Sequence, residues 1–170
     1  VQTWGNMTVI ENIMAGMHLR LKGGLISSGL WLPWVGRTEK EAMVEAKNIL
    51  DSLGLLGRWK WPASQLPLGK QKLLEFGRTL AMKPELMLLD EPASGLTSAE
   101  MEQLSERICQ FKEEGMTFVI VEHHMGMVMD IADEIAVLSN GKLIAEGSSD
   151  EVRRDPKVMD AYLKGRKGSC

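Results

Sequence analysis

Cysteine is scarce in this chain, and histidine is nearly as rare. Only Cys109 and Cys170 occur among the 170 residues, together with three histidines. A disulfide scaffold needs more cysteines than this, so the composition favours a reduced compartment, and we expect the cytoplasm. A zinc site is disfavoured as well, because neither cysteine lies at ligand spacing and His18 is distant in sequence from His123 and His124.

An excess of basic charge and a long apolar run are also missing. The 20 lysine and arginine residues are outnumbered by 23 aspartate and glutamate residues, giving a formal net charge of -3. This balance provides no broad electropositive face, so nucleic acid is not an expected partner. The longest apolar stretch, residues 25–35, is interrupted by serine, glycine and proline and falls short of the roughly 20 residues of a membrane-spanning helix. If the protein works at a membrane, other subunits anchor it.

The start of the chain lacks both an initiating methionine and a targeting signal. The first residue is Val1, and no basic stretch, apolar segment and small-residue cleavage site follow it. We therefore expect a truncated N-terminus. The length of 170 residues and the hydrophobic fraction of 44% suit a single domain that is incomplete at this end.

Helix starts, in contrast, are clearly marked. A threonine or serine followed three residues later by glutamate forms a capping box, in which each side chain bonds the backbone amide of the other residue. Four such pairs occur: Thr8 with Glu11, Thr38 with Glu41, Thr97 with Glu100, and Ser148 with Glu151. They predict helices after residue 8, over about 38–53 with Gly54 as a left-handed cap, over about 98–113 with Gly115 as its end, and over 149–154, with a last helix over 156–164.

Short apolar runs between these helices predict strands. Residues 86–89 and 118–121 are continuously apolar, which is typical of strands buried on both faces of a sheet. The helix between them favours a parallel pair, covered by helices on both sides. Residues 135–138 and 143–145 flank Asn140-Gly141, a dipeptide suited to a tight hairpin turn.

One segment, residues 23–37, fits neither the helical nor the strand period. It is rich in glycine, serine and tryptophan and is interpreted as a loop or insertion. Trp31 and Trp34 have two interpretations: they contact a partner or lipid headgroups, or they pack over the domain core.

Ionisable residues follow both apolar strands. The first strand ends in Asp90-Glu91 and the second in Glu122-His123-His124. Parallel strands bring their carboxyl ends to one sheet edge, where ligands bind. Asp90 is a candidate magnesium ligand, because this ion prefers hard oxygen ligands on a rigid support, and Glu91 can then polarise an attacking water. The alternatives are that the acids only turn the chain and that the histidines are solvated.

These motifs together resemble those of ABC transporter ATPases. Residues 86–97, Leu-Met-Leu-Leu-Asp-Glu-Pro-Ala-Ser-Gly-Leu-Thr, resemble the Walker B strand and D-loop, and residues 66–72, Leu-Pro-Leu-Gly-Lys-Gln-Lys, take the place of the signature loop. His123 resembles the switch histidine that senses the terminal phosphate, and residues 140–147 resemble the hairpin that follows. Four ordered motifs cover essentially the whole chain.

Within the family, the resemblance is to branched-chain amino acid importers, and in particular to the first of their two ATPase subunits. It is carried by Met7-Thr8-Val9-Ile10-Glu11-Asn12, by the Leu-Pro-Leu-Gly form of the signature, by Val121-Glu122-His123, and by Pro156 with Ala161-Tyr162-Leu163.

The resemblance implies a fold, a set of site residues and two cofactors. The implied fold is α/β, a P-loop NTPase-like core whose parallel sheet is flanked by helices, with an added helical subdomain, and without the N-terminal strands and phosphate loop. ATP and Mg²⁺ are the implied cofactors, with Asp90 as magnesium ligand and Glu91 and His123 as catalytic residues. The implied contacts to a partner subunit's ATP are the signature residues Leu68, Gly69, Lys70 and Gln71 and the D-loop residues Ser94, Gly95, Leu96 and Thr97.

The chain departs from the family pattern at three places. No Gly-x-x-x-x-Gly-Lys-Ser/Thr loop occurs, so the chain as given has no cradle for the β- and γ-phosphates and is expected to be inactive alone. In the signature, Pro67, Leu68 and Lys70 replace serine, glycine and glutamine, and in the D-loop Thr97 replaces aspartate. Gln2 lies too close to Met7 to be assigned as the lid-loop glutamine.

Residues 8–84 are therefore expected to form a mostly helical subdomain, 85–147 part of the core sheet, and 148–170 C-terminal helices and a tail. The implied partners are a second ABC ATPase subunit, as a homo- or heterodimer, transmembrane permeases and, indirectly, an external binding protein, which places the chain at the cytoplasmic face of the membrane. Two alternatives stay open: another cargo, such as urea, an amide or a lipid-linked substrate, and a non-catalytic pairing module without a phosphate loop.

Overall fold

The computed structural model describes residues 4–18 and 33–160 of the chain. Two compact units divide it, Val1–Val121 and Glu122–Cys170, and each is described by itself. Of the helices in the described ranges, none is both long enough and apolar enough to cross a membrane.

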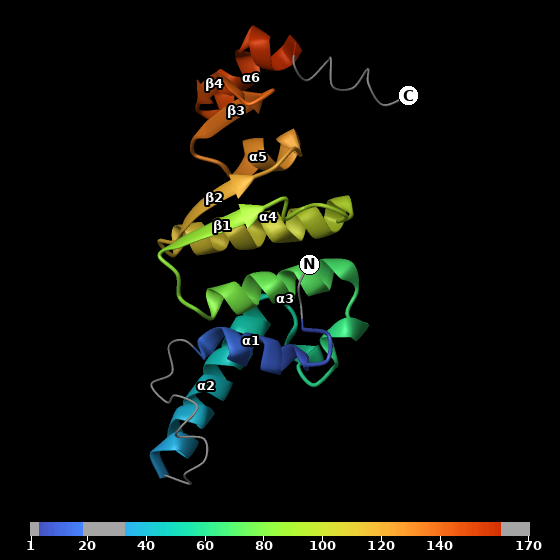
Figure 1. Ribbon diagram of the computed structural model, residues 1–170, viewed down its shortest axis with the longest axis vertical. Coiled ribbons are helices and arrows are strands. Elements are labelled where there is room, and N and C mark those ends of the chain that lie inside the picture. The colour runs from blue at the N-terminus through green and yellow to red at the C-terminus, as the bar shows by residue number, and fades with distance from the viewer. Residues whose placement is uncertain (1–3, 19–32, 161–170) are drawn as a thin grey trace. The chain divides into compact units, whose positions relative to one another are not determined.

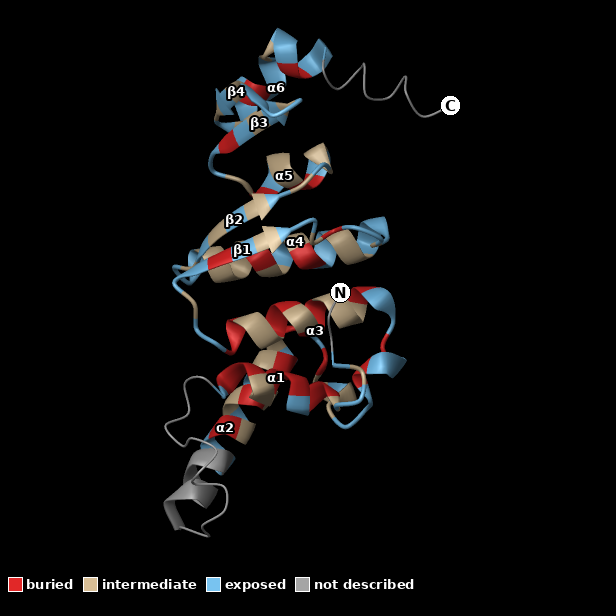
Figure 2. Cartoon of the chain, in the orientation of Figure 1, coloured by how far each residue is buried: buried red, intermediate tan, exposed pale blue. Residues whose placement is uncertain are grey.

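Helices make up the first part of the first unit. In chain order they are α1 (Val9–Met17), α2 (Pro33–Ser52), the 3-10 turns η2 (Leu56–Arg58) and η3 (Ala63–Gln65), and α3 (Leu68–Leu80). α1 packs against both α2 and α3, and Figure 2 shows buried residues gathered along these three helices. The most deeply buried apolar side chains include Val9, Ile13, Leu50, Leu53 and Leu74. The helical part thus has a closed apolar core.

The start of α2 differs from the prediction. The sequence pattern placed the helix start at Thr38, but α2 begins at Pro33, so Thr38 lies inside the helix. Proline suits the first turn of a helix, because its φ is already helical and the amide that it lacks has no partner there. Residues 33–37 of the expected loop are therefore helical, and residues 23–32, with Trp31, lie outside the described residues.

The other capping boxes are confirmed. Glu11, Glu100 and Glu151 accept hydrogen bonds from the backbone amides of Thr8, Thr97 and Ser148, at 2.7, 2.9 and 2.8 Å. Each pair opens a helix at the predicted residue, namely α1, α4 (Ser98–Glu113) and α6 (Ser149–Arg154).

The remainder of the first unit is a strand, a helix and a strand: β1 (Leu86–Asp90), α4, and β2 (Thr117–Val121). The two strands pair in parallel, as predicted, with Leu86 opposite Thr117 and Asp90 opposite Val121 (Figure 1). Gly115, at φ +97°, follows the C-terminus of α4, where the end of this helix was expected.

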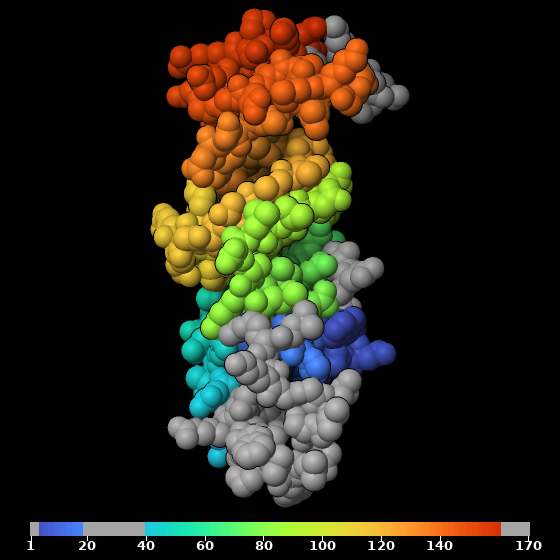
Figure 3. All heavy atoms as spheres, turned by 60° about the vertical axis from the view of Figure 1, so that its left-hand side comes forward, coloured from blue at the N-terminus to red at the C-terminus, as the bar shows by residue number. Residues whose placement is uncertain are grey.

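Burial of both strand faces was predicted, and this is wrong for the described residues. Leu88 is 71% exposed, and Val119, beside it in the register, is 50% exposed, whereas Met87 on the opposite face is buried. The reason is that, among the residues that the structure describes, no second layer covers this face of the pair. In the space-filling view the segment around residues 85–95, coloured light green, lies at the surface (Figure 3).

The second unit contains α5 (Met125–Ile131), the antiparallel strands β3 (Ile135–Ser139) and β4 (Lys142–Gly147), α6, and helical residues 156–160. The hairpin prediction is confirmed, with Asn140 and Gly141 both at positive φ, 50° and 74°. A small core of Ile135, Val152 and Val158 holds the unit together. Helix α5 was not predicted.

Candidate functional site

The carboxyl end of β1 carries two acidic side chains on differently shaped backbone. Asp90 is the last residue of the strand and is exposed, so its carboxylate stands on a rigid support with access for a hydrated ion. Glu91 follows at φ +44°, a left-handed conformation that is uncommon for a residue with a side chain and that tends to occur at functional sites. Its amide donates to the carbonyl of Val121 at 2.9 Å, which fixes this turn to the end of β2.

A lysine from α3 holds the same turn from another side. Lys72 Nζ donates to the carbonyl oxygens of Glu91 at 3.2 Å and Pro92 at 3.0 Å. The residue lies in the first turns of α3 and is the last of the signature run 66–72. The turn that carries the acids is therefore tied to the signature helix.

The signature loop becomes the N-terminus of α3. Pro67 is the N-cap residue and provides no side-chain cap, while Gln71 bonds back to the carbonyl of Leu66 at 2.8 Å. Leu68 is 46% exposed at the first helical position. The positive end of a helix that lacks a cap of its own is suited to an anionic oxygen.

Signature residues lie against the D-loop and the first turns of α4. A β-carbon at Gly69 would collide with the carboxylate of Glu100, so a larger residue there would have to displace that side chain. Lys70 Nζ bonds Gln103 Oε1 at 3.2 Å, and a β-carbon at Gly95, in the D-loop, would lie 3.2 Å from Leu68. The structure thus brings together the two motifs that the sequence analysis assigned to contact with a partner's nucleotide.

The carboxylate of Glu100 shows that this helix end accepts a negative charge. Hydrogen bonds from the backbone and side chain of Thr97 lower the pKa of Glu100, and the amide of Gly69 and the charge of Lys70 lower it further. An anionic oxygen already lies at the N-terminus of α3, so the donor set there fits a phosphate oxygen. Asp90, as an exposed carboxylate, likewise fits a magnesium ion.

Aromatic packing positions α3 over the strands. Phe76 lies 5.8 Å from Phe111 of α4 and 6.2 Å from Phe118 of β2, measured between ring centroids. These are all three phenylalanines of the chain. Phe76 is buried and the other two are half-buried, so these ring contacts join the signature helix to the strand-helix-strand unit.

The second unit begins with the predicted switch region. Glu122 Oε2 accepts the backbone amides of His123 at 2.9 Å and His124 at 3.2 Å, and it lies 2.9 Å from His124 Nδ1. The side chain of Glu122 is fully buried, whereas that of His123 is 64% exposed. His123 can therefore reach a ligand from solvent while Glu122 shapes the turn beneath it.

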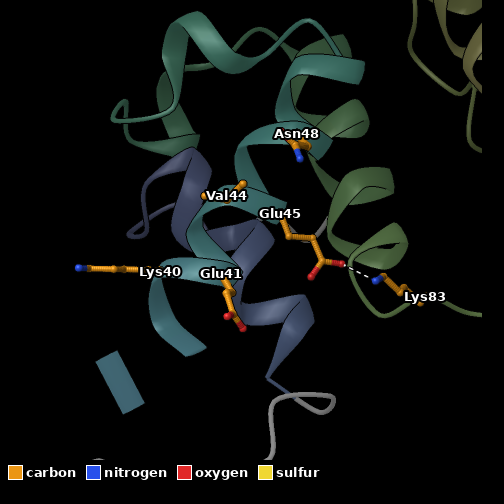
Figure 4. Close-up of a pocket in the computed structure, with 6 residues that line it drawn as sticks. All are labelled: Lys40, Glu41, Val44, Glu45, Asn48 and Lys83. Carbon is orange, nitrogen blue, oxygen red and sulfur yellow. Dashed lines mark ion pairs between the residues drawn. The ribbon is translucent and has the colours of Figure 1, made fainter. Parts of the chain in front are cut away.

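A pocket of about 420 Å³ in the first unit lies away from these residues. It is lined by Lys40, Glu41, Val44, Glu45, Asn48 and Lys83. Figure 4 shows that an ion pair between Glu45 and Lys83, at 2.9 Å, forms part of its wall. The pocket contains none of the predicted site residues, and exposed ion pairs of this kind contribute little stability.

Three contributing residues were missed by the sequence analysis. Lys72 and Gln103 stand in helices whose facing surfaces are set by tertiary packing, so no local pattern marks them. Glu100 was recognised as a capping residue, but its approach to Gly69 joins residues 31 positions apart, which sequence spacing cannot show.

Comparison with known proteins supports the resemblance to ABC transporter ATPases. A family described as "ABC transporter" matches residues 1–94, and one described as "Branched-chain amino acid ATP-binding cassette transporter" matches residues 142–163. The high-affinity branched-chain amino acid transport ATP-binding protein LivG of Salmonella typhimurium is 39% identical over 164 residues, 96% of this chain and 64% of the relative. BraF of Pseudomonas aeruginosa, which bears the same description, is 33% identical over the same shares. The chain thus spans less than two thirds of these relatives.

Solved structures agree. The ADP conformation of MJ1267, an ATP-binding cassette of an ABC transporter, matches with a TM-score of 0.75 and 32% identity, over 94% of this chain and 63% of that one. An inward-facing metal-chelate type ABC transporter matches in fold alone, with a TM-score of 0.78 at 19% identity, over 96% and 61%. The family match over more than half of the residues and this common fold lead to one conclusion: the chain belongs to the ABC transporter family.

Proposed function

We propose that this chain is the larger part of the ATP-hydrolysing subunit of an ABC importer for branched-chain amino acids. The observation that carries the proposal is the close approach of signature residues at the N-terminus of α3 to the D-loop and the start of α4, with Lys72 of the same helix bonding the turn that bears Glu91. The names of the relatives in Salmonella and Pseudomonas support the cargo.

Each site residue has a proposed role. Asp90 holds the magnesium ion, which when bound neutralises phosphate charge, and Glu91 orients and deprotonates the attacking water. His123 contacts the terminal phosphate and stabilises the charge that develops there. These roles are assigned from the positions of the three residues at the carboxyl ends of strands.

A second set of residues faces the nucleotide of a partner ATPase subunit. We assign to it the signature residues Leu68, Gly69, Lys70 and Gln71 and the D-loop residues Ser94, Gly95, Leu96 and Thr97. Because Pro67 supplies neither a hydroxyl nor an amide, the contact depends on the backbone near Gly69 and the charge of Lys70. The dimer is completed by the phosphate loop of the partner.

The wider assembly follows from the same proposal. Residues 8–84 form the helical subdomain, 85–147 part of the core sheet and 148–170 the C-terminal segment. Transmembrane permease subunits hold the ATPase at the cytoplasmic face of the membrane, and a binding protein delivers the amino acid from outside.

Leucine uptake tests this function. The full-length gene is expressed, with its cognate permease subunits, in a bacterial strain that lacks its own branched-chain ATPase subunit. We expect radiolabelled leucine uptake to be restored, and His123→Ala to lower it on the order of 10²-fold, the usual effect of losing an electrostatic stabiliser. His18→Ala, in an exposed residue of the helical part, is the matched control. If uptake of urea is restored and uptake of leucine is not, the proposal that branched-chain amino acids are the cargo is wrong.

A further inference from the structure

Three neighbouring side chains in the second unit hold their metal-binding atoms close together. Oxygen or nitrogen atoms of Glu122, His123 and His124 all lie within 4.8 Å of one another. From this geometry we propose that these residues form a site for one divalent transition-metal ion of the zinc class.

The distances suit tetrahedral coordination. Ligand bonds of 2.0–2.1 Å place neighbouring ligand atoms roughly 3.3 Å apart in a tetrahedron. Glu122 Oε2 lies 2.9 Å from His124 Nδ1 and 3.7 Å from His123 Nδ1, values on either side of this spacing. The imidazole rings are 4.3 Å apart between centroids, with a tilt of 37°. Small side-chain rotations bring the three atoms onto one ion.

The chemistry of the ligands selects the kind of ion. Two imidazole nitrogens and one carboxylate oxygen suit Zn²⁺, Cu²⁺ or Ni²⁺, whereas Mg²⁺ and Ca²⁺ prefer oxygen ligands alone. Three protein ligands leave the fourth tetrahedral position for water, and the exposed ring of His123 gives solvent access to it.

Glu122 is held in place for this role. Its Oε2 accepts the amides of His123 and His124, which fix the orientation of the buried carboxylate. A carboxylate offers about four acceptor positions over its two oxygens. Because both amides donate to Oε2, the metal bond is made by Oε1 or replaces one of the two amide bonds. The small number of histidines and cysteines disfavoured zinc in the sequence, whereas Glu122 provides the third ligand atom of this cluster.

Occupation of the site has a consequence for the proposed function. An ion bound to His123 and the terminal phosphate of ATP would compete for the same imidazole, so the metal would act as an inhibitor. This consequence rests on the proposed function. The metal site itself does not, and the experiment below contains no nucleotide.

Metal uptake by the whole chain tests the site. Zn²⁺ is titrated calorimetrically into the 170-residue chain in which Cys109 and Cys170 are both replaced by serine, which removes thiol binding. We expect one ion per chain, and at least about tenfold weaker binding in His123→Ala and in His124→Ala, since each loses one of three ligands.

Two further measurements guard against misfolding and nonspecific binding. His18→Ala is the matched control, because it removes the one histidine outside the cluster, and it should bind like its parent. Co²⁺ bound to the parent should give the intense visible absorption of a tetrahedral site, and circular dichroism should show the alanine variants folded. Equal affinity in parent and His124→Ala, or loss of binding in His18→Ala, would overturn the proposal.

Discussion

The helical part of the first unit and its β1–β2 pair bury their apolar side chains to very different extents. Leu50 of α2 is 0% exposed within the helical core, whereas Leu88 of β1 is 71% exposed. Both are leucines in regular structure, so residue type does not explain the difference. The helices α1, α2 and α3 cover one another, while the strands have one covered face and one open face. The helical part thus buries its apolar side chains through its own contacts, whereas the strands leave one apolar face exposed among the described residues.

The largest expected effect comes from the leucine pair itself. Leu50→Ala should lower the free energy of unfolding by about 2–5 kcal/mol, because it leaves a cavity in a packed core. Leu88→Ala should change it by less than about 0.5 kcal/mol, as is usual for exposed positions. Urea unfolding followed by circular dichroism measures both. Equal losses would show that the open face is covered in solution, for example by association of chains.

A smaller effect is expected at Gly16, where α1 contacts α3. A β-carbon at Gly16 would lie 2.1 Å from the backbone carbonyl of Arg78, which cannot move without shifting α3. Gly16→Ala should therefore cost about 1–3 kcal/mol, the range for overpacking a core. Gly57→Ala is the matched control, since its added β-carbon would meet nothing within 4 Å. A neutral Gly16→Ala would mean that the helices are further apart.

The smallest effect concerns helix caps in both regions. Hydrogen bonds from Thr8 and Thr97 lower the pKa of Glu11 and Glu100 below the usual 4.5, so the ionised form stabilises the fold. That stabilisation is complete above the unfolded-state pKa and is lost as pH falls through the lower folded-state pKa. We expect the melting temperature to fall as the pH is lowered below about 5.

Replacement of Thr97 separates this contribution from other acid effects. Thr97→Ala should cost about 1 kcal/mol at neutral pH, as for other N-caps, and should reduce the decline at low pH. Ser105→Ala, within the same helix, is the control. An unchanged pH profile in Thr97→Ala would contradict the role of this capping box.

Local features of the fold were predictable from the sequence, and long-range ones were not. Thr97 with Glu100 fixed the start of α4, and Asn140-Gly141 fixed the hairpin, because caps and tight turns depend on residues a few positions apart. The continuous apolar run at 86–89 indicated a strand correctly, but it could not reveal whether both faces are covered. Pro33 began α2 ahead of the expected capping box at Thr38, because two start signals stood close together.

The candidate site follows the same rule. The strand ends pointed to Asp90 and Glu91, since the carboxyl edge of parallel strands is a local consequence of the topology. The hydrogen bonds from Lys72 to the turn after β1 depend on how α3 packs. That packing rests on Phe76, whose partners Phe111 and Phe118 lie far along the chain.

ATP hydrolysis by a complete cassette tests the central claim most directly. The chain is joined to the upstream part of LivG of Escherichia coli, 38% identical over the matched residues, and steady-state turnover and ATP binding are compared with Gln or Glu at position 91. Glu91→Gln should lower turnover on the order of 10²-fold or more with little change in ATP affinity, as expected for loss of a general base. Glu85→Gln, just before β1, should leave both unchanged. Undiminished turnover in Glu91→Gln would contradict the account.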